Sequence, residues 1–116
     1  MKSNYQTKPL KEAKGENPET KDDIHGAIEI CPLIRCLMDC EMFQRLRGLR
    51  QLGATHYIYV NANHTRFEHS LGVAHLARRL CNVLSKKQPQ LGISSKDIKC
   101  LEIAGLYHDL GHGPFR

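Results

Sequence analysis

The sequence lacks an apolar stretch of the ~20 residues that a helix needs to cross a bilayer. Its first segment, MKSNYQTKPLKEAKGENPETKDD, also lacks the apolar core of a secretory signal. Beyond scattered lysines, the chain has no basic run of the nuclear-localisation type. These absences predict a protein of the cytosol or nucleus that is not secreted and has no membrane partner. A chain of 116 residues has room for one small core.

The sequence also lacks a CxxC pair. Its five cysteines are Cys31, Cys36, Cys40, Cys81 and Cys100. An odd number without that spacing argues against both a disulfide framework and a zinc ribbon. We expect free thiols in a reducing compartment.

The formal net charge of +5 is unevenly distributed. Residues 1–23 hold five lysines and five acidic residues, so the whole excess falls on residues 24–116, where arginine is prominent. The planar guanidinium binds phosphate through two parallel hydrogen bonds. A polyanionic partner is therefore expected, a nucleotide first and a nucleic acid second.

The chain divides into two parts by composition. Residues 1–23 are polar and predict a disordered tail, whereas 24–116 show helical periodicity. Short helices are expected at 32–38 and 41–53. The β-branched and aromatic segment THYIYV, residues 55–60, predicts one short β strand or hairpin arm in a mainly α fold.

Two longer helices are expected at 66–87 and 96–111, the second after an N-cap at Ser94 or Ser95. The apolar pattern of the three larger helices predicts buried faces. These faces comprise Met42, Phe43, Leu46 and Leu49; Leu71, Ala74, Leu76 and Leu80; and Ile98, Leu101 and Gly105, with His108 on the same face.

A histidine and an aspartate stand side by side at His108 and Asp109, just before Gly111 ends the helix. Imidazole and carboxylate are common ligands of catalytic transition metals. The natural third ligand is His69, if the two long helices lie antiparallel. Spacing alone leaves two alternatives open, because these groups also serve as hydrogen-bonded core residues and as helix caps.

The exact sequence around these residues is more specific than their spacing. HTRFEHSLGVAHLA and IAGLYHDLGHGPF resemble the HD-domain metal-dependent phosphohydrolases. The stretches DIHG, FQRLR, QLG, KQPQL and HDLGHGPF resemble, within that family, the deoxynucleoside triphosphate triphosphohydrolases that carry SAM and HD domains. The resemblance runs from Asp22 to Phe115. It implies a partial HD-domain helical fold, and nuclear localisation.

The resemblance also implies roles for individual residues. The metal ligands would be His69, His108 and Asp109, holding iron, zinc or manganese. His112 would be catalytic and face the triphosphate. Substrate would be bound by Gln51, the backbone of Leu52 and Arg66. The implied reaction converts a deoxynucleoside triphosphate, brought with Mg²⁺, to deoxynucleoside and triphosphate.

A second nucleotide site is implied by the same resemblance. Asp39, Gln44 and Arg47 match residues that read an activating guanine nucleotide, GTP or a dNTP. Their acceptor and donor groups suit the guanine edge. From periodicity alone, the three form a solvated helix face. Homo-oligomer formation and binding of single-stranded nucleic acid are further implied for the complete protein.

The resemblance places 24–116 as the N-terminal portion of an HD domain that is incomplete at its C-terminus. A fourth ligand and further catalytic histidines are expected beyond it, so the chain is expected to be a fragment that is inactive alone. The alternative is a non-enzymatic relative that binds nucleotide or nucleic acid, or that regulates a full-length paralogue. A third alternative is a helical interaction domain in which His108 and Asp109 only cap a helix.

Overall fold

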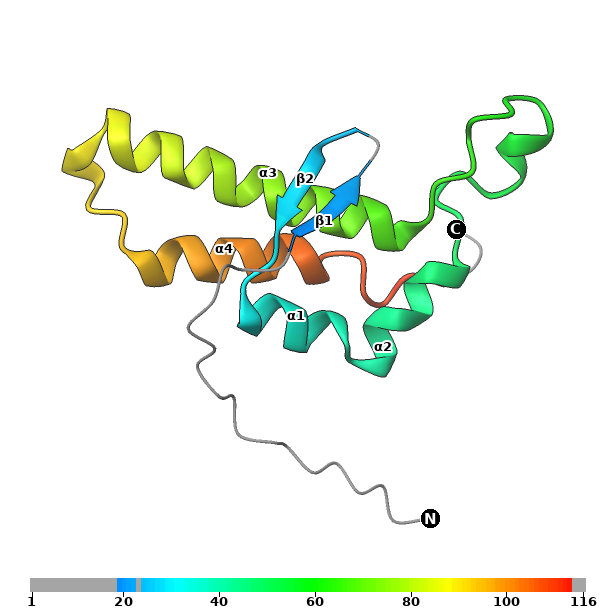
Figure 1. Ribbon diagram of the computed structural model, residues 1–116, viewed down its shortest axis with the longest axis horizontal. Helices are drawn as coiled ribbons and strands as arrows, with labels where there is room; N and C mark the ends of the chain where they lie inside the picture. The colour runs from blue at the N-terminus through cyan, green and yellow to red at the C-terminus, as the bar shows by residue number, and fades with distance from the viewer. Residues whose placement is uncertain (1–18, 23, 114–116) are drawn as a thin grey trace, which may run out of the picture.

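The computed structural model describes residues 19–22 and 24–113. Among these residues, helices predominate and a two-stranded hairpin accompanies them (Figure 1), as the predicted mainly α class requires. None of the described helices combines the length and apolar character needed to span a membrane. Of the predicted disordered tail, 19–22 form a strand, and the remaining residues of 1–23 lie outside the described residues.

The hairpin pairs β1 (Glu19–Asp22) with β2 (Gly26–Glu29) in antiparallel register, with Thr20 opposite Ile28. In the turn, Asp22 Oδ2 accepts hydrogen bonds from the backbone N–H groups of Ile24 and His25 at 3.2 and 2.9 Å. Gly26 has a φ of 72°, which a glycine adopts without steric cost. Ile28 therefore points into the core from β2.

The short helical segments follow the hairpin. They are α1 (Pro32–Met38), α2 (Glu41–Gln44), and the 3-10 helices η1 (Arg45–Gly48) and η2 (Gly53–Tyr57). The single helix predicted at 41–53 is thus wrong beyond Gly48, because the chain tightens to 3-10 geometry and then becomes extended at Leu49.

The strand predicted at 55–60 is also wrong. Its first part belongs to η2, and side chains from Tyr57 to Val60 are 68–81% exposed. A β-branched segment becomes a strand only where a partner strand and a packed face are available. The described residues offer neither here, and the strands lie in the hairpin instead.

The two long helices are α3 (Arg66–Lys87) and α4 (Ser95–Tyr107), joined through the 3-10 helix η3 (Pro89–Leu91) and Gly92. Each begins with a capping box, formed by Thr65 with Glu68 and by Ser94 with Asp97. The helices lie antiparallel and side by side (Figure 1). The start of α3 therefore lies beside the end of α4.

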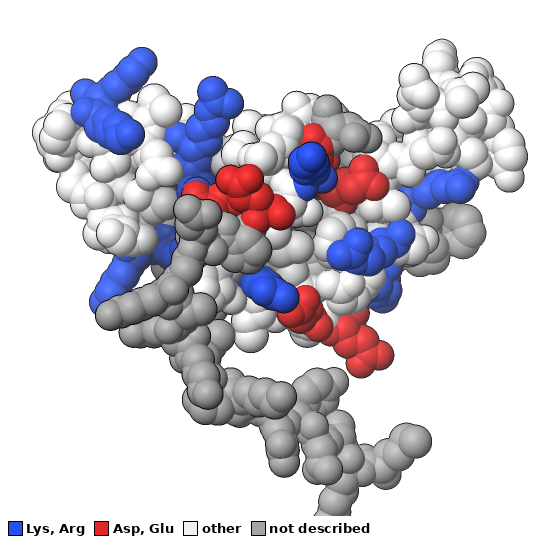
Figure 2. Space-filling model, viewed as in Figure 1, with Lys and Arg blue, Asp and Glu red and all other residues white. Residues whose placement is uncertain are grey.

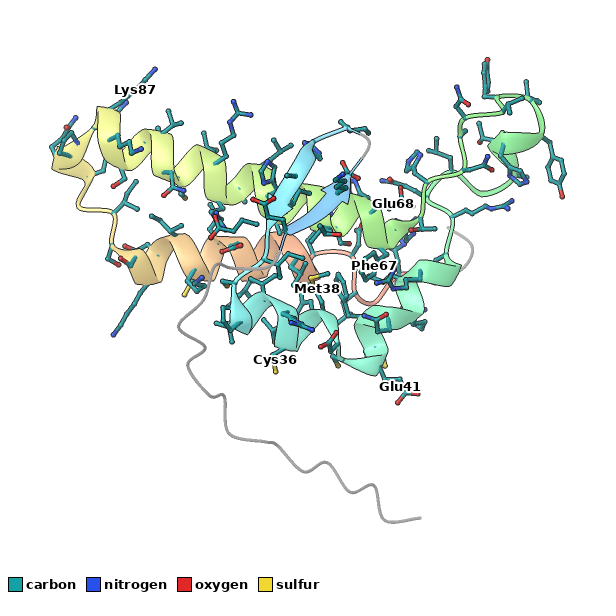
Figure 3. All side chains as sticks on the ribbon, viewed as in Figure 1. Cys36, Met38, Glu41, Phe67, Glu68 and Lys87 are labelled. Atoms are coloured by element: carbon teal, nitrogen blue, oxygen red, sulfur yellow. The ribbon has the colours of Figure 1, made fainter. Side chains whose placement is uncertain are left out.

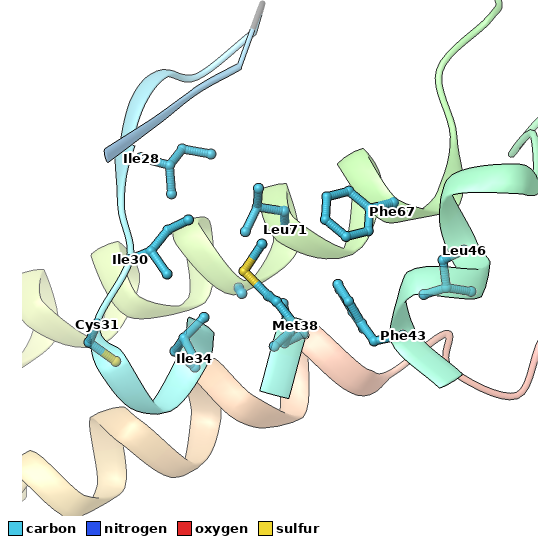
Figure 4. Close-up of a cluster of buried hydrophobic side chains, with 11 residues drawn as sticks. Ile28, Ile30, Cys31, Ile34, Met38, Phe43, Leu46, Phe67 and Leu71 are labelled. Atoms are coloured by element: carbon cyan, nitrogen blue, oxygen red, sulfur yellow. The ribbon is translucent and has the colours of Figure 1, made fainter. Parts of the chain in front are cut away.

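One buried apolar cluster joins the hairpin to the helices (Figure 4). Figure 3 shows Phe67 and Met38 directed into it, whereas Cys36 and Glu41 project outward. The cluster comprises Ile28, Ile30, Cys31, Ile34, Met38, Phe43, Leu46, Phe67, Leu71, Ala74 and Leu106. The ring centroids of Phe43 and Phe67 lie 5.1 Å apart, and Tyr107 donates a hydrogen bond to Leu37 O at 2.8 Å.

Several residues predicted to face this core are exposed. Leu76, Leu80, Leu101 and Met42 are 48, 56, 42 and 54% exposed. The buried residues of α3 lie mainly in its first half, and those of α4 are Glu102 and Leu106. Helical periodicity identifies an apolar stripe, but burial depends on which part of the stripe a neighbour covers.

Gly105 on α4 allows the two long helices to approach closely. A Cβ atom added there would lie 3.3 Å from the backbone of Ala74. We expect Gly105→Val to lower the free energy of unfolding by about 1–3 kcal/mol, because backbone atoms must move to admit the side chain. The exposed neighbour provides a matched control, Ala104→Val. Equal urea midpoints for the two variants would contradict this account of helix packing.

Candidate metal centre

His69, His108 and Asp109 come together where α3 begins and α4 ends. His69 lies in the first turn of α3, and His108 is the C-cap of α4. The antiparallel helix pair therefore joins groups 39 residues apart. One ligand atom from each of the three lies within 4.8 Å of the other two.

The three facing atoms form a nearly equilateral triangle. His69 Nε2 lies 3.2 Å from His108 Nε2 and 3.5 Å from Asp109 Oδ2, and His108 Nε2 lies 3.3 Å from the same oxygen. Ligands about 2.0–2.1 Å from a tetrahedral ion are about 3.3–3.4 Å apart. The residues present therefore fit a transition metal in both spacing and chemistry.

The tautomer of His108 is set by the backbone. Its Nδ1 lies 2.6 Å from Gly105 O, so Nδ1 carries the proton and donates it to the carbonyl. In the neutral ring, Nε2 is then a lone-pair acceptor that faces the triangle. A backbone carbonyl commonly orients a metal-binding imidazole in this way.

The electrostatics favour a neutral imidazole at His69. Burial lowers the pKa of His69 from its usual 6.5, and the neighbouring His108 and Arg66 lower it further against the opposing effect of Asp109. At neutral pH the ring is therefore available as a ligand.

Asp109 is the centre of a wider polar network. Its Oδ2 atom lies 3.4 Å from Arg66 Nη1, in addition to its contacts with the two histidines. Its Oδ1 atom lies 3.7 Å from His112 Nε2. The buried Arg66 thus holds the carboxylate from one side, and His112 holds it from the other.

Arg45 fastens the turn that follows α4. Its Nη2 donates to Leu110 O at 2.8 Å and to His112 O at 2.7 Å. The sequence alone did not identify this residue, because an arginine between Gln44 and Leu46 has the pattern of an exposed helix position. Only the fold shows that it reaches residues 65 and 67 positions away.

A pocket of about 380 Å³ opens beside the triangle. Gln51 and His69 line it, so Gln51 joins Arg66 as a predicted substrate residue that lies beside the metal ligands. Leu52 is not among the lining residues, is about half exposed, and its carbonyl accepts from Thr55. The sequence did not predict the other lining residues as part of a binding site. They are Asp22, Ile24, His25, Asn61, His64, Glu68, Gly72, Val73 and Leu76.

The three residues predicted to read a guanine nucleotide lie along α1, α2 and η1, away from the pocket lining. Asp39 is the exposed C-cap of α1. Gln44 donates to Met38 O at 2.6 Å, and Arg47 Nε donates to Gln44 Oε1 at 2.8 Å. The Arg47 guanidinium also stacks 3.8 Å from the ring centroid of Phe67. Gln44 and Arg47 are therefore hydrogen-bonded to each other, and each also contacts other residues of the protein.

Acidification is expected to destabilise the metal-free chain. The pKa values of His69 and His75 are both lowered from 6.5, chiefly by burial. Between 6.5 and these lower values the unfolded chain binds more protons, so the free energy of unfolding falls as the pH decreases through this range. Urea unfolding with a chelator present, at about pH 7.5 and about pH 5.5, measures the loss.

The matched variant for this measurement carries His69→Gln and His75→Gln. It is expected to lose less stability on acidification than the unchanged chain, because the two groups no longer titrate. The same loss in both proteins would show that other groups cause the pH dependence.

Comparisons with known proteins find one family and several named relatives. Residues 66–116 match the HD domain family. Over 94 residues, or 81% of its length, the chain is similar to proteins named deoxynucleoside triphosphate triphosphohydrolase SAMHD1. It is 58% identical to the protein of Bos taurus, 56% to that of Mus musculus and 55% to that of Homo sapiens. The chain spans 16, 14 and 15% of these relatives' lengths, respectively.

Proposed function

We propose that this chain, whose residues 66–116 match the HD domain family, contributes to metal-dependent hydrolysis of deoxynucleoside triphosphates. The observation that carries the proposal is the triangle of His69, His108 and Asp109. The names of its SAMHD1 relatives supply the substrate class. The products would be deoxynucleoside and triphosphate.

In this proposal the three ligands hold iron, zinc or manganese. A bound transition metal lowers the pKa of a water molecule and polarises a phosphoryl oxygen. The chain's own residues keep the site ready for it. Gly105 O holds the His108 proton on Nδ1, while Arg66 orients the Asp109 carboxylate.

His112 and Arg66 would act on the triphosphate. His112 Nε2 faces Asp109 Oδ1, whereas Arg66 Nη1 faces Asp109 Oδ2. The two side chains therefore flank the ligand carboxylate. A histidine there can donate to a phosphate oxygen or move a proton. The Arg66 fork has further N–H groups available to a phosphate beyond the one facing Asp109.

The pocket beside the triangle would receive the nucleoside. Gln51 lines this pocket, and so does His69, which is also one of the three metal ligands. An amide or backbone group close to the sugar would favour deoxyribose, because an added 2′-hydroxyl requires space and a partner. Leu52 would contribute through its backbone.

An activating guanine nucleotide would be read by Asp39, Gln44 and Arg47. Their closeness in space supports the proposal, since Gln44 donates to the carbonyl of Met38, the residue before Asp39, and its Oε1 accepts from Arg47 Nε. Binding would have to exchange these internal hydrogen bonds for bonds to guanine. Homo-oligomer formation and nuclear localisation are proposed only on the resemblance described above.

The experiment measures triphosphate release from dGTP by chromatography, with GTP and Mg²⁺ present. The isolated chain and a longer product that carries the rest of an HD domain are each stripped of metal and then resupplied with Fe²⁺, Zn²⁺ or Mn²⁺. The isolated chain is expected to release no triphosphate. In the longer product, release that returns with metal, and that His108→Ala abolishes while the control His56→Ala does not, is the expected result. His56 is suitable because its imidazole lies in η2, outside the triangle.

Two outcomes would contradict this proposal. Metal-independent binding of dGTP without hydrolysis would favour the non-enzymatic nucleotide-binding alternative, which the arginine excess of residues 24–116 supports. Tight binding of single-stranded nucleic acid without hydrolysis would favour a non-enzymatic relative that binds nucleic acid. On the viewed face, basic and acidic side chains alternate rather than form one basic surface (Figure 2).

A further inference from the structure

A thiol, an amine and a buried carboxylate meet on the side of α4 that faces the start of α1. Lys99 Nζ donates to Cys31 Sγ at 3.0 Å and lies 3.7 Å from Glu102 Oε2. None of the three belongs to the metal centre. Cys31 lies at the edge of the buried apolar cluster, as the N-cap of α1 (Figure 4).

The carboxylate is the unusual member of this group. The Glu102 side chain is only 4% exposed, yet its Oε2 atom has no hydrogen-bond partner among the described residues. Arg78 Nη1 lies 3.7 Å from the other oxygen and also donates to Glu29 O. Glu102 Oε2 therefore has an unused acceptor site on the side where Lys99 lies. A buried carboxylate oxygen without a hydrogen-bond donor lowers the stability of the fold, so its presence calls for an explanation.

We propose that Cys31, Lys99 and Glu102 form a hydroperoxide-sensitive site in which oxidation joins Cys31 to Lys99 through a sulfur–nitrogen bond. The proposal is independent of the metal chemistry. It rests on the short sulfur–nitrogen distance and on the buried carboxylate beside the amine.

The oxidation step uses one hydroperoxide molecule, such as hydrogen peroxide. The Cys31 sulfur attacks a peroxide oxygen, a sulfur–oxygen bond forms, the oxygen–oxygen bond breaks, and water leaves. Cys31 becomes a sulfenic acid. Cys31 is 8% exposed, so a small oxidant is favoured over a bulky disulfide.

The second step closes the link. The Lys99 ammonium passes one proton to Glu102 Oε2, and the amine nitrogen attacks the sulfur. The sulfur–nitrogen bond forms as the sulfur–oxygen bond breaks, and the leaving hydroxide takes a second proton from the nitrogen and departs as water. Glu102 then releases the first proton to solvent. Overall, thiol, ammonium and one hydrogen peroxide give the sulfenamide, two water molecules and one proton. The starting separation of 3.0 Å lies within the range of reactive contacts.

The link would connect positions 68 residues apart. It would tie the start of α1 to α4 and restrict the unfolded chain as a disulfide does. We therefore expect oxidation to raise the urea midpoint, and a thiol reductant to restore the original value.

The test uses the full chain with its exposed cysteines replaced, as Cys36→Ser, Cys40→Ser and Cys100→Ser. Cys81 remains as an internal control, because it is also 8% exposed, and no lysine of the described residues donates to its sulfur. One equivalent of hydrogen peroxide is expected to remove about two mass units from the chain through loss of two hydrogens. Peptide mapping should find Cys31 joined to Lys99.

Three variants separate the steps. Lys99→Arg keeps the positive charge beside Glu102 but should abolish the link and leave a sulfenic acid on Cys31 that dimedone traps. Glu102→Gln should slow closure of the link. Cys31→Ser should abolish all of these reactions and still fold, because serine is favoured at an N-cap. Oxidation of Cys31 and Cys81 at equal rates without a link, or an unmodified Cys31, would overturn the proposal.

Discussion

Replacing Asp109 by asparagine is expected to lower the affinity of the chain for Zn²⁺ by more than about 100-fold, because residues that only support ligands already contribute about 10–100-fold. The amide keeps the shape of the carboxylate but loses its charge and one of its acceptor oxygens. The Oδ2 atom faces both histidines and Arg66, so the substitution affects two of the three edges of the triangle.

Competition with a coloured chelator measures this affinity, and urea unfolding of the metal-free chain measures stability. Asp97→Asn provides a matched control, since that carboxylate caps α4 at the end opposite to the metal centre. If Asp109→Asn bound Zn²⁺ as tightly as Asp97→Asn, the carboxylate would not be a ligand.

Loss of the Arg45 side chain is expected to weaken Zn²⁺ binding by about tenfold, although Arg45 is not a proposed ligand. Its two hydrogen bonds hold the carbonyls of Leu110 and His112, in the turn immediately after Asp109. These carbonyls lie beyond the end of α4, and the guanidinium forms charge-assisted hydrogen bonds with them. Without the guanidinium, the turn is free to sample positions in which Asp109 no longer faces the histidines.

The measurement compares Arg45→Ala with Arg79→Ala, which removes the same charge from an exposed position on α3. Only Arg45→Ala is expected to lower the affinity for Zn²⁺. An equal loss in both would assign the effect to the overall charge of the protein. Unchanged binding in Arg45→Ala would show that the turn holds its position without the side chain.

The sequence predicted the parts of this site that depend on local signals. The N-cap predicted at Ser94 or Ser95 lies where α4 begins, and the predicted antiparallel helix pair brings His69 to His108. The resemblance named the same residues as ligands. Local signals sufficed because both histidines lie at helix ends, where the chain's own pattern fixes their position.

Features that depend on distant contacts could not be predicted. The segment 55–60 has a strand composition but no strand to pair with, while Glu19 and Thr20 in a polar segment pair with β2. Leu76 and Leu101 follow an apolar period that no neighbour covers among the described residues. Arg45 and Lys99 act through partners more than sixty residues away.

X-ray absorption spectroscopy of the Zn²⁺-loaded chain tests the central claim most directly, because it identifies the ligand atoms. The structure predicts two imidazole ligands and further oxygen ligands at about 2.0–2.2 Å, without sulfur. His108→Ala should remove one imidazole signal. A sulfur shell at about 2.3 Å would assign the metal to cysteines and contradict the site at His69, His108 and Asp109.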